Sequence, residues 1–285
     1  MLTSDQIASF HKNGYLVVED AISTKQLDDL STQFSQWVEL SRKELEPFGS
    51  TLDNRPRFDL EPGHSSEKPA LRRVSSPVEI STAYLDVMNN SEMLDAVAAL
   101  IGPDVKFHHS KINSKLPGAG TAVKFHQDFL FTPHSNDSLI TALLFIDEVT
   151  LNNGPLEVVP GSHKGPLYQL WHNGIFTGAI GDGELESIQD QTVSCVGPAG
   201  SVCLMHTRLL HGSAPNHSDK PRTLFICVYS AADSQPLSPN PVPNEFDQQI
   251  VKGKSSNQIR CTNYEMMRPE LPTGASFFNQ QSKAD

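Results

Sequence analysis

Residues 139–161, LITALLFIDEVTLNNGPLEVVPG, contain two short apolar runs of the kind that form β-strands. The first run covers 139–147 and the second covers 156–159, and both are rich in large or β-branched apolar residues. Turn-forming residues separate the runs at Asn153-Gly154-Pro155 and end the second run at Pro160-Gly161. Apolar runs of this length, bounded by Gly and Pro, indicate buried strands rather than helices. The stretch therefore predicts two strands of an all-β unit.

The same pattern extends over about 104–232. Turn residues such as Pro117-Gly118 and Gly197-Pro198 separate further apolar runs, which occupy 104–116, 122–126, 191–196, 200–206 and 222–231. Many short strands at this spacing are typical of a β-sandwich or a β-barrel. We therefore predict that this part of the chain forms a β-sheet core.

The part before this core, about residues 1–103, is predicted to be mainly helical. Capping and stop signals divide it into segments that carry apolar residues at helical spacing. In order along the chain, these signals are Thr3 or Ser4, Asn13-Gly14, Ser23, Ser91 and Gly102-Pro103. A short strand is expected at 15–18. Residues 46–82 are rich in Pro, Ser and charged residues, and we expect them to form an extended loop region.

The tail after residue 232 has four prolines within 236–243 and little periodicity, so we expect it to lie over the surface of the body. No internal repeat divides the chain. We therefore expect one domain over 1–285 that is mainly β with flanking helices. Its parts are a helical segment at about 1–103, a β core at about 104–232 and a covering segment at 233–285.

The chain has 285 residues and a formal net charge of -11. This charge disfavours nucleic acid or an anionic membrane as the main partner, because both need clustered Lys and Arg. No secretion signal and no run of roughly 18 apolar residues is present, so we expect a cytoplasmic protein without a membrane span. The four cysteines form no C-x-x-C pair and are expected to be reduced, buried thiols: Cys195, Cys203, Cys227 and Cys261.

The stretch Phe125-His-Gln-Asp-Phe129 places His126 and Asp128 two residues apart. On a strand, residues i and i+2 face the same side, so both side chains can reach one ion. A neutral imidazole and a carboxylate belong to the two-His-one-carboxylate set, which binds Fe(II) and leaves coordination positions open. The pattern alone is weak evidence, since His217-Ser-Asp219 repeats it. The residues around His126 are apolar, however, and a buried charge there requires a partner or a metal.

A third metal ligand must come from another part of the chain. The candidates are the downstream histidines His134, His163, His172, His206, His211 and His217. Of these, His211 lies at the end of a predicted β segment, in Leu209-Leu-His-Gly-Ser213. Its neighbourhood also offers polar side chains for a cosubstrate, but the residues themselves leave the choice open.

Arg222 follows His211 by eleven residues and opens the apolar run 223–230. The planar guanidinium of an Arg at the mouth of a barrel strand can pair with a carboxylate through two hydrogen bonds. The distal carboxylate of a dicarboxylic cosubstrate would fit, with Ser213 as an additional hydroxyl donor. Viewed alone, Arg222 is slightly more in keeping with an ordinary surface position than with this role.

Taken together, these residues resemble the phytanoyl-CoA dioxygenase family of Fe(II)/2-oxoglutarate-dependent oxygenases. The matching motifs are His126-Gln-Asp128, Asn153-Gly-Pro-Leu-Glu-Val-Val-Pro-Gly-Ser-His163, and His211-Gly-Ser213 with Arg222 at the family interval. The opening Phe10-His-Lys-Asn-Gly-Tyr-Leu-Val-Val18 is similar as well, and the resemblance covers roughly residues 3–232. The tail shows no obvious match.

The resemblance implies a double-stranded β-helix (jelly roll, cupin-like) core with iron in its mouth. It implies that His126, Asp128 and His211 are the iron ligands. The implied reaction uses Fe(II), 2-oxoglutarate and O2 to oxidise a small organic substrate, with release of succinate and CO2. Related halogenases lack the ligand carboxylate, so Asp128 implies hydroxylation or another oxidation rather than chlorination.

The resemblance also implies how the cosubstrate is bound. Arg222 would pair with the C5 carboxylate of 2-oxoglutarate, and the hydroxyl of Ser213 would assist it. In related proteins a residue on the strand before the H-x-D motif contacts 2-oxoglutarate too, and Lys111 falls near that place. We therefore expect Arg222, Ser213 and Lys111 to form the 2-oxoglutarate site.

Substrate contacts are predicted from position in the sequence. Phe131 and His134 follow the ligand pair and are expected near the entrance of the site, although Phe131 is equally compatible with core packing. Trp171 lies in the long insert 164–190, which would form either a lid or a surface loop. Arg73 lies at a predicted loop-to-strand edge, where a solvated position is expected. Directed inward, it would favour an anionic substrate.

Three interpretations of the function stay open. The substrate is a small polar metabolite, which the net charge of -11 favours, or an acyl-CoA, whose phosphates need a basic surface. Alternatively, the chain is a non-catalytic, cupin-like metal-binding or sensing protein. Such a protein has no need of Arg222 and Ser213, so these two residues favour the enzyme. The sequence makes no prediction of the oligomeric state.

Overall fold

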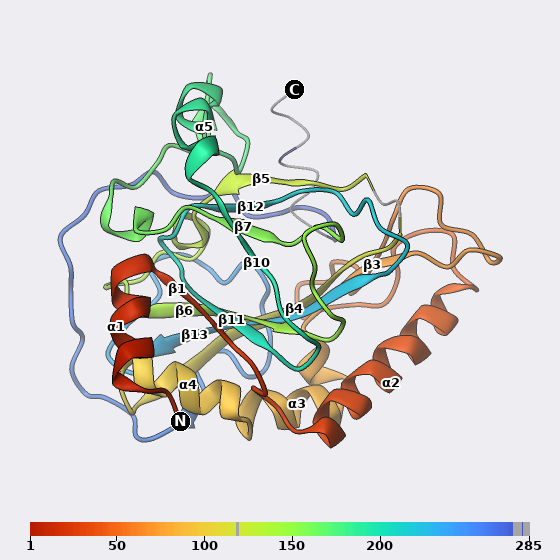
Figure 1. Ribbon diagram of the computed structural model, residues 1–285, viewed down its shortest axis with the longest axis horizontal. Coiled ribbons are helices and arrows are strands. Elements are labelled where there is room, and N and C mark those ends of the chain that lie inside the picture. The colour runs from red at the N-terminus through yellow and green to blue at the C-terminus, as the bar shows by residue number, and fades with distance from the viewer. Residues whose placement is uncertain (118–119, 276–280, 282–285) are drawn as a thin grey trace.

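The structure is a computed structural model that describes residues 1–117, 120–275 and 281. Two antiparallel sheets face each other (Figure 1). The major sheet contains, in spatial order, β1 (Tyr15–Val18), β11 (Val202–His206), β6 (Leu139–Phe145), β13 (Arg222–Ala231), β4 (Val105–Lys115), β3 (Leu71–Ser75) and β2 (Phe58–Leu60), and β14 (Ile250–Lys252) also pairs with β4. The minor sheet contains β10 (Val193–Cys195), β7 (Leu156–Val158), β12 (His211–Ser213) and β5 (Val123–His126).

Helices cover the outer side of the major sheet. The α-helices described are α1 (Ser4–Asn13), α2 (Thr24–Ser41), α3 (Thr82–Asn89), α4 (Glu92–Ile101) and α5 (Asp182–Ile188). Short elements are the 3-10 helices η1 (Pro77–Glu79), η2 (Asp128–Leu130), η3 (Ser162–Lys164) and η4 (Gln189–Gln191), and a hairpin of β8 (Trp171–His172) and β9 (Ile175–Phe176). Figure 1 shows α3 and α4 below the major sheet and the minor sheet above it. None of the helices in the described part of the chain has the length and apolar composition of a membrane span.

An aromatic cluster joins the helices to the major sheet. Tyr84 of α3 is fully buried, and its ring meets Phe225 of β13 edge-on with 4.8 Å between the ring centroids. Trp37 of α2 stacks on Tyr84 at 5.3 Å, and the Tyr84 hydroxyl donates a hydrogen bond to the Leu30 carbonyl oxygen at 3.1 Å. Full burial of one large apolar side chain contributes about 1.5–3 kcal/mol. The main apolar core therefore lies between the helices and the major sheet.

The other face of the major sheet lines the space between the two sheets. Side chains alternate along a strand, so the neighbours of Phe225, which are Leu224 and Ile226, point away from the helices. The register of β13 with β4 pairs Leu224 with Asn113 and Ile226 with Lys111. The interior wall is therefore apolar along the middle of β13 and polar along β4.

The N-terminal capping signals act as predicted. Thr3 forms a reciprocal capping box with Gln6 at the start of α1, Ser23 begins α2 in the same way, and Ser91 caps α4. Gly14 ends α1 with φ at 81°, a left-handed conformation that favours glycine. Each strand predicted between 104 and 231 contains an observed strand.

The prediction of an extended loop over 46–82 is wrong in part, because β2, β3 and the start of α3 lie within it. Leu71 and Val74 of β3 are fully buried, and this strand pairs with β4. The strand was not recognised in the sequence because Arg72 and Arg73 interrupt its apolar pattern. The three-residue strand β12 was not predicted as a strand either.

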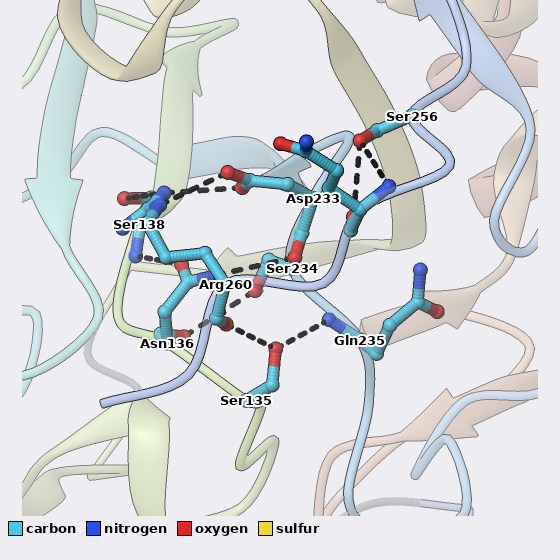
Figure 2. Close-up of polar contacts among 9 residues, drawn as sticks. Ser135, Asn136, Ser138, Asp233, Ser234, Gln235, Ser256 and Arg260 are labelled. Atoms are coloured by element: carbon cyan, nitrogen blue, oxygen red, sulfur yellow. Dashed lines mark hydrogen bonds and ion pairs between the residues drawn. The ribbon is translucent and has the colours of Figure 1, made fainter. Parts of the chain in front are cut away.

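Hydrogen bonds hold the tail against the body (Figure 2). The Arg260 guanidinium pairs with both carboxylate oxygens of Asp233, at 2.9 and 3.1 Å, and the Ser135 hydroxyl donates to the Arg260 carbonyl oxygen at 2.9 Å. The neighbouring Cys261 is exposed, so the prediction of a buried thiol is wrong there, while the other three cysteines are buried. An irregular covering segment has few side chains directed into a core, which explains the exposure.

A second contact joins two distant parts of the tail. The Arg55 guanidinium donates hydrogen bonds to the carbonyl oxygens of Pro241, at 2.6 Å, and Pro272, at 3.1 Å. One side chain of the N-terminal part therefore positions two tail segments at the same place on the body.

Gly14→Ala is expected to destabilise the protein far more than Gly174→Ala. Both glycines have positive φ, 81° and 77°. This conformation costs an alanine about 1–2 kcal/mol. At Gly14 an added Cβ would also collide with the His163 ring and lie 2.7 Å from Leu209, whereas at Gly174 it meets nothing within 4 Å. Denaturant unfolding should give losses of about 1–2 kcal/mol for Gly174→Ala and at least about 3 kcal/mol for Gly14→Ala. Equal losses would contradict this account of the turn.

Candidate active site

His126, Asp128 and His211 meet in the space between the sheets. His126 is the last residue of β5 and His211 the first of β12, and the register of these strands places the two residues opposite each other. Their ring centroids are 4.2 Å apart. Gln127 has extended φ and ψ of -118° and 125°, so Asp128, which begins η2, points to the same side as His126. His126 and Asp128 therefore face the same side, as the sequence predicted, although β5 itself ends at His126.

The three side chains present their ligand atoms to one point. Asp128 Oδ1 lies 3.5 Å from His126 Nε2 and 3.6 Å from His211 Nε2, and the three ligand atoms all lie within 4.8 Å of one another. Among the described residues, no other group of three or more His, Cys, Asp or Glu side chains gathers in this way. The donor set of two imidazole nitrogens and one carboxylate oxygen fits Fe(II).

Backbone carbonyl groups fix the orientation of both rings. His126 Nδ1 lies 2.8 Å from the Lys124 carbonyl oxygen, and His211 Nδ1 lies 3.0 Å from the Leu209 carbonyl oxygen. A carbonyl oxygen can only accept, so the proton of each neutral ring resides on Nδ1. This leaves the lone pair of Nε2 directed toward Asp128, which is the tautomer that a metal requires. Burial also lowers the pKa of His211 to about 4, so this ring is neutral at physiological pH.

The Asp128 carboxylate is held ionised. Burial acts to raise its pKa, but the neighbouring His211, His126 and Lys111 side chains outweigh burial and lower the pKa. The Thr141 hydroxyl donates a hydrogen bond of 2.6 Å to Oδ2, which leaves Oδ1 facing the two histidines. The site therefore offers one ionised carboxylate oxygen beside two imidazole nitrogens, a donor set that suits a divalent cation.

Two pockets adjoin the site and are called here the first and second lobes; both are lined by His126, Asp128 and Lys111, and His211 lines the first. The first lobe has a volume of about 660 Å³ and extends between the sheets toward Arg222. The second lobe has a volume of about 560 Å³ and extends toward Phe131 and the tail. The candidate metal site thus borders both lobes through His126 and Asp128.

The far end of the first lobe is cationic. Arg222 is buried there, and its Nε donates a hydrogen bond to the Gly154 carbonyl oxygen at 2.9 Å. Lys115, paired with Arg222 in the register of β4 and β13, donates from Nζ to the Ser213 hydroxyl at 2.7 Å. Burial, with a smaller contribution from the charge of Arg222, lowers the pKa of Lys115 to about 6. An anionic group would stabilise this end of the lobe.

Comparison with known proteins identifies the family. A model of phytanoyl-CoA dioxygenase (PhyH) matches residues 10–224. The chain belongs to the phytanoyl-CoA dioxygenase family. A probable alpha-ketoglutarate-dependent hypophosphite dioxygenase of Stutzerimonas stutzeri is 32% identical over 89% of this chain and 87% of the relative. The peroxisomal phytanoyl-CoA dioxygenase of Homo sapiens is 25% identical over 96% of this chain and 83% of the relative.

A solved structure of the same fold is the crystal structure of EctD from S. alaskensis with bound Fe. It superposes with a TM-score of 0.66 at 22% sequence identity and covers 92% of this chain and 87% of that one. The likeness confirms the predicted double-stranded β-helix core. As a member of the phytanoyl-CoA dioxygenase family, the chain is an Fe(II)- and 2-oxoglutarate-dependent dioxygenase, which confirms the predicted enzyme class and cofactors.

The structure brings most of the residues singled out in the sequence of this dioxygenase to the cavity. Ser213 and Arg222 line the first lobe, and Lys111 lines both lobes. Burial lowers the pKa of Lys111 to about 8, with the charge of Arg73 acting in the same direction. Phe131 lines the second lobe, and its ring meets the His126 ring edge-on at 5.5 Å.

Arg73 lies inside the protein, so the expectation of a solvated position is wrong. Its side chain lines the second lobe and is 4% exposed. The physical reason is its place on β3, where it pairs with Asn113 and shares the inward side of the sheet.

His134 and Trp171 are not among the residues that line either lobe. The chain turns through η2 after Asp128, and His134 becomes fully buried behind it, with its ring 5.0 Å from His108. Burial lowers the pKa of His134 to about 3. Trp171 packs on Phe176 at 5.3 Å and donates from its indole nitrogen to a tail carbonyl oxygen. The insert 164–190 therefore places Trp171 beside the tail rather than over the cavity.

Several lining residues were not found from the sequence. They share the inward faces of β4 and β6 or lie just after η2: His109, Asn113, Lys115, Thr141 and Thr132. Alternation from Lys111 along β4 is the signal that predicts His109, Asn113 and Lys115. Nothing in the sequence singled out Thr141, because all residues of its strand are buried and the strand shows no polar and apolar alternation.

Thr141→Val is expected to weaken Fe(II) affinity. Valine keeps the shape of the side chain and removes the hydroxyl that donates to Asp128. Loss of a group that orients a metal ligand typically costs about 10- to 100-fold in affinity. An anaerobic Fe(II) titration of the apo-protein measures the change.

Thr223→Val is the matched control for this prediction. Thr223 is also buried, lies on the opposite face of the major sheet, and its hydroxyl is bonded to Ser114 Oγ at 2.9 Å. Both variants lose one buried hydroxyl, and only Thr141→Val should change iron affinity. The same affinity in both variants would exclude the role given to Thr141.

Proposed function

We propose that this dioxygenase binds Fe(II) through His126, Asp128 and His211 and hydroxylates a C–H bond of a small organic metabolite, with release of succinate and CO2. The observation that carries the proposal is the arrangement of the two lobes around the ligand residues. His126 and Asp128 line both lobes, His211 lines the first, and the buried guanidinium of Arg222 lies at the far end of the first lobe. A cosubstrate and a substrate can therefore approach the same ion from different sides.

Iron, when bound, supplies the activation of O2. The contribution of the chain is to present the ion with two oriented lone pairs and one carboxylate oxygen, which the hydrogen bonds of His126, His211 and Asp128 support.

Arg222 is proposed to bind the C5 carboxylate of 2-oxoglutarate. Burial lowers the pKa of Arg222 to about 10, so the group stays charged at neutral pH and needs an anionic partner. Ser213 Oγ accepts a hydrogen bond from Lys115, which leaves the hydroxyl proton of Ser213 free to be donated to the same carboxylate. Lys111, beside Asp128, is proposed to contact the cosubstrate near the iron.

A small substrate is favoured over the acyl-CoA considered from the sequence, because the phosphates of coenzyme A need a basic surface and the net charge of the chain is -11. Tail residues form part of the wall of the second lobe. A non-catalytic metal-binding protein is not supported, because the family is one of dioxygenases. A cytoplasmic location stays a prediction.

Substitution of each proposed ligand should abolish iron binding. We expect the wild-type protein, without O2, to develop a weak visible absorption band only when Fe(II) and 2-oxoglutarate are both present. His126→Ala, Asp128→Ala and His211→Ala should lose both bound iron and the band while keeping their circular dichroism spectra. His206→Ala is the control, because His206 lies beside His163 and lines neither lobe. A band retained in His211→Ala and lost in His206→Ala would move the third ligand to His206.

Arg222→Gln should weaken binding of 2-oxoglutarate while leaving Fe(II) affinity near that of the wild type. We expect the apparent Kd of 2-oxoglutarate to rise about 10- to 100-fold, since hydrogen bonds to charged groups contribute about 1.5–3 kcal/mol. The amplitude of the visible band against 2-oxoglutarate concentration measures this Kd. Arg42→Gln, which removes a surface guanidinium paired with Glu39, is the control. An unchanged Kd in Arg222→Gln would refute the proposed anchor.

A further inference from the structure

Arg73 is placed by the sheet register on the inward side of the cavity. It lies in β3, opposite Asn113 of β4, while Ser75 on the same strand lies opposite Lys111. The side chains of Arg73, Lys111 and Asn113 therefore share one side of the sheet. Arg73 is 4% exposed and lines the second lobe, away from the lobe that ends at Arg222.

The guanidinium of Arg73 lacks the partners that other buried arginines have. Its Nε makes one long hydrogen bond of 3.4 Å to the Ser75 hydroxyl, and its Nη1 is buried without a hydrogen-bond partner in the described part of the chain. By contrast, Arg72 pairs with Asp59 at 2.7 Å, and Arg57 pairs with Glu79 at 2.8 Å. A buried cation without a partner is costly, so a ligand that supplies one is favoured.

Among the described residues that line the second lobe, no carboxylate is available to Arg73. Asp128 is the acidic side chain among the described lining residues, and it is proposed to be occupied by iron. Asp59 acts on Arg73 from further away and is itself paired with Arg72. Burial lowers the pKa of Arg73 only to about 10, so the side chain is charged at neutral pH.

The other residues that line this lobe indicate what the rest of the ligand is like. Phe131, Val228 and Val242 give it an apolar surface, and Lys111 adds a second cationic side chain on the side of the ligand triad. A molecule with one oxyanion at Arg73 and a short apolar part against these side chains would lie beside the iron site. The anion at Arg222 does not compete with it, because the two arginines line different lobes.

We propose that Arg73 is the anion-binding residue of the substrate site and that the substrate is a small molecule carrying an oxyanion group, a carboxylate or a phosphonate. This inference rests on the proposed function. The reaction is then hydroxylation of a C–H bond of this anion: substrate, 2-oxoglutarate and O2 give hydroxylated substrate, succinate and CO2. The substrate C–H bond breaks and a C–O bond forms, and 2-oxoglutarate supplies the two further electrons that O2 requires.

Binding of matched probes tests the proposal without turnover. The protein is loaded with redox-inert Zn(II) and saturating 2-oxoglutarate, then titrated calorimetrically with propanoate, ethylphosphonate or the neutral propanamide. At least one anion should bind and propanamide should not, and the anion that binds more tightly identifies the oxyanion type. Binding of the amide as tightly as the anions, or binding of neither anion, would overturn the proposal.

Arg73→Gln should weaken binding of the preferred anion at least about 10-fold, because a bidentate charged contact is lost. Arg42→Gln, the surface control, should bind it as the wild type does. Anion affinity that is unchanged in Arg73→Gln would overturn the proposal. The visible band formed with Fe(II) and 2-oxoglutarate should persist in Arg73→Gln. Its absence from the wild type would instead refute the proposed function, so the two failures are distinguishable.

Thermal unfolding separates a ligand-binding role from a structural one. If Arg73 serves a ligand, Arg73→Met removes an unpaired buried charge, and the ligand-free variant should melt at the same temperature as the wild type or higher. The preferred anion should raise the Tm of the wild type and leave that of Arg73→Met unchanged. A clear drop in the Tm of the ligand-free variant would show that Arg73 supports the fold, and it would overturn the proposal.

Discussion

The antiparallel pairing of β5 with β12 is the constraint on which the active-site geometry depends. It places His211 opposite His126, and the hydrogen-bonded ladder sets their separation, since paired residues in antiparallel strands lie about 4.5–5.5 Å apart. A slip of one residue would turn one ring to the other face of the sheet. Gly212 permits this pairing, because a Cβ there would lie 2.8 Å from the Phe125 ring and 2.9 Å from the Val123 carbonyl oxygen.

The two faces of the major sheet affect stability in opposite ways. The outer face buries apolar side chains such as Tyr84 and Phe225 against the helices, and this face supplies most of the stability. The inner face holds Lys111, Lys115 and Arg222 out of water, and burial lowers the pKa of each of them. Lys111 and Arg222 stay charged at neutral pH, reduce stability in the free protein and provide binding energy for anionic ligands, so the core of the fold and the site are kept on separate surfaces.

The sequence predicted the parts of this molecule that depend on local rules. Helix caps, the β runs and the relation of His126 to Asp128 follow from neighbouring residues. The choice of His211 among the downstream histidines depended on strand pairing, which is not local, and without the family resemblance it stayed open. Arg73 was placed on the surface because its neighbour Arg72 made the segment resemble a solvated loop. His134 was placed near the entrance because the turn at η2 has no clear sequence signal.

The origin of the lining residues has a consequence for how such a protein can diversify. The described lining of the first lobe comes from the two sheets and the segments next to them, whereas Pro241, Val242 and Pro272 of the tail complete the second. Arg55 holds both tail segments by backbone carbonyl oxygens, so this attachment does not depend on which side chains the segments carry. Mutations and length changes in the tail can therefore alter which substrates bind, while the residues of the iron site on the strands stay unchanged. Part of the substrate lobe is thus encoded in a stretch of the gene that is separate from the one encoding the candidate iron ligands.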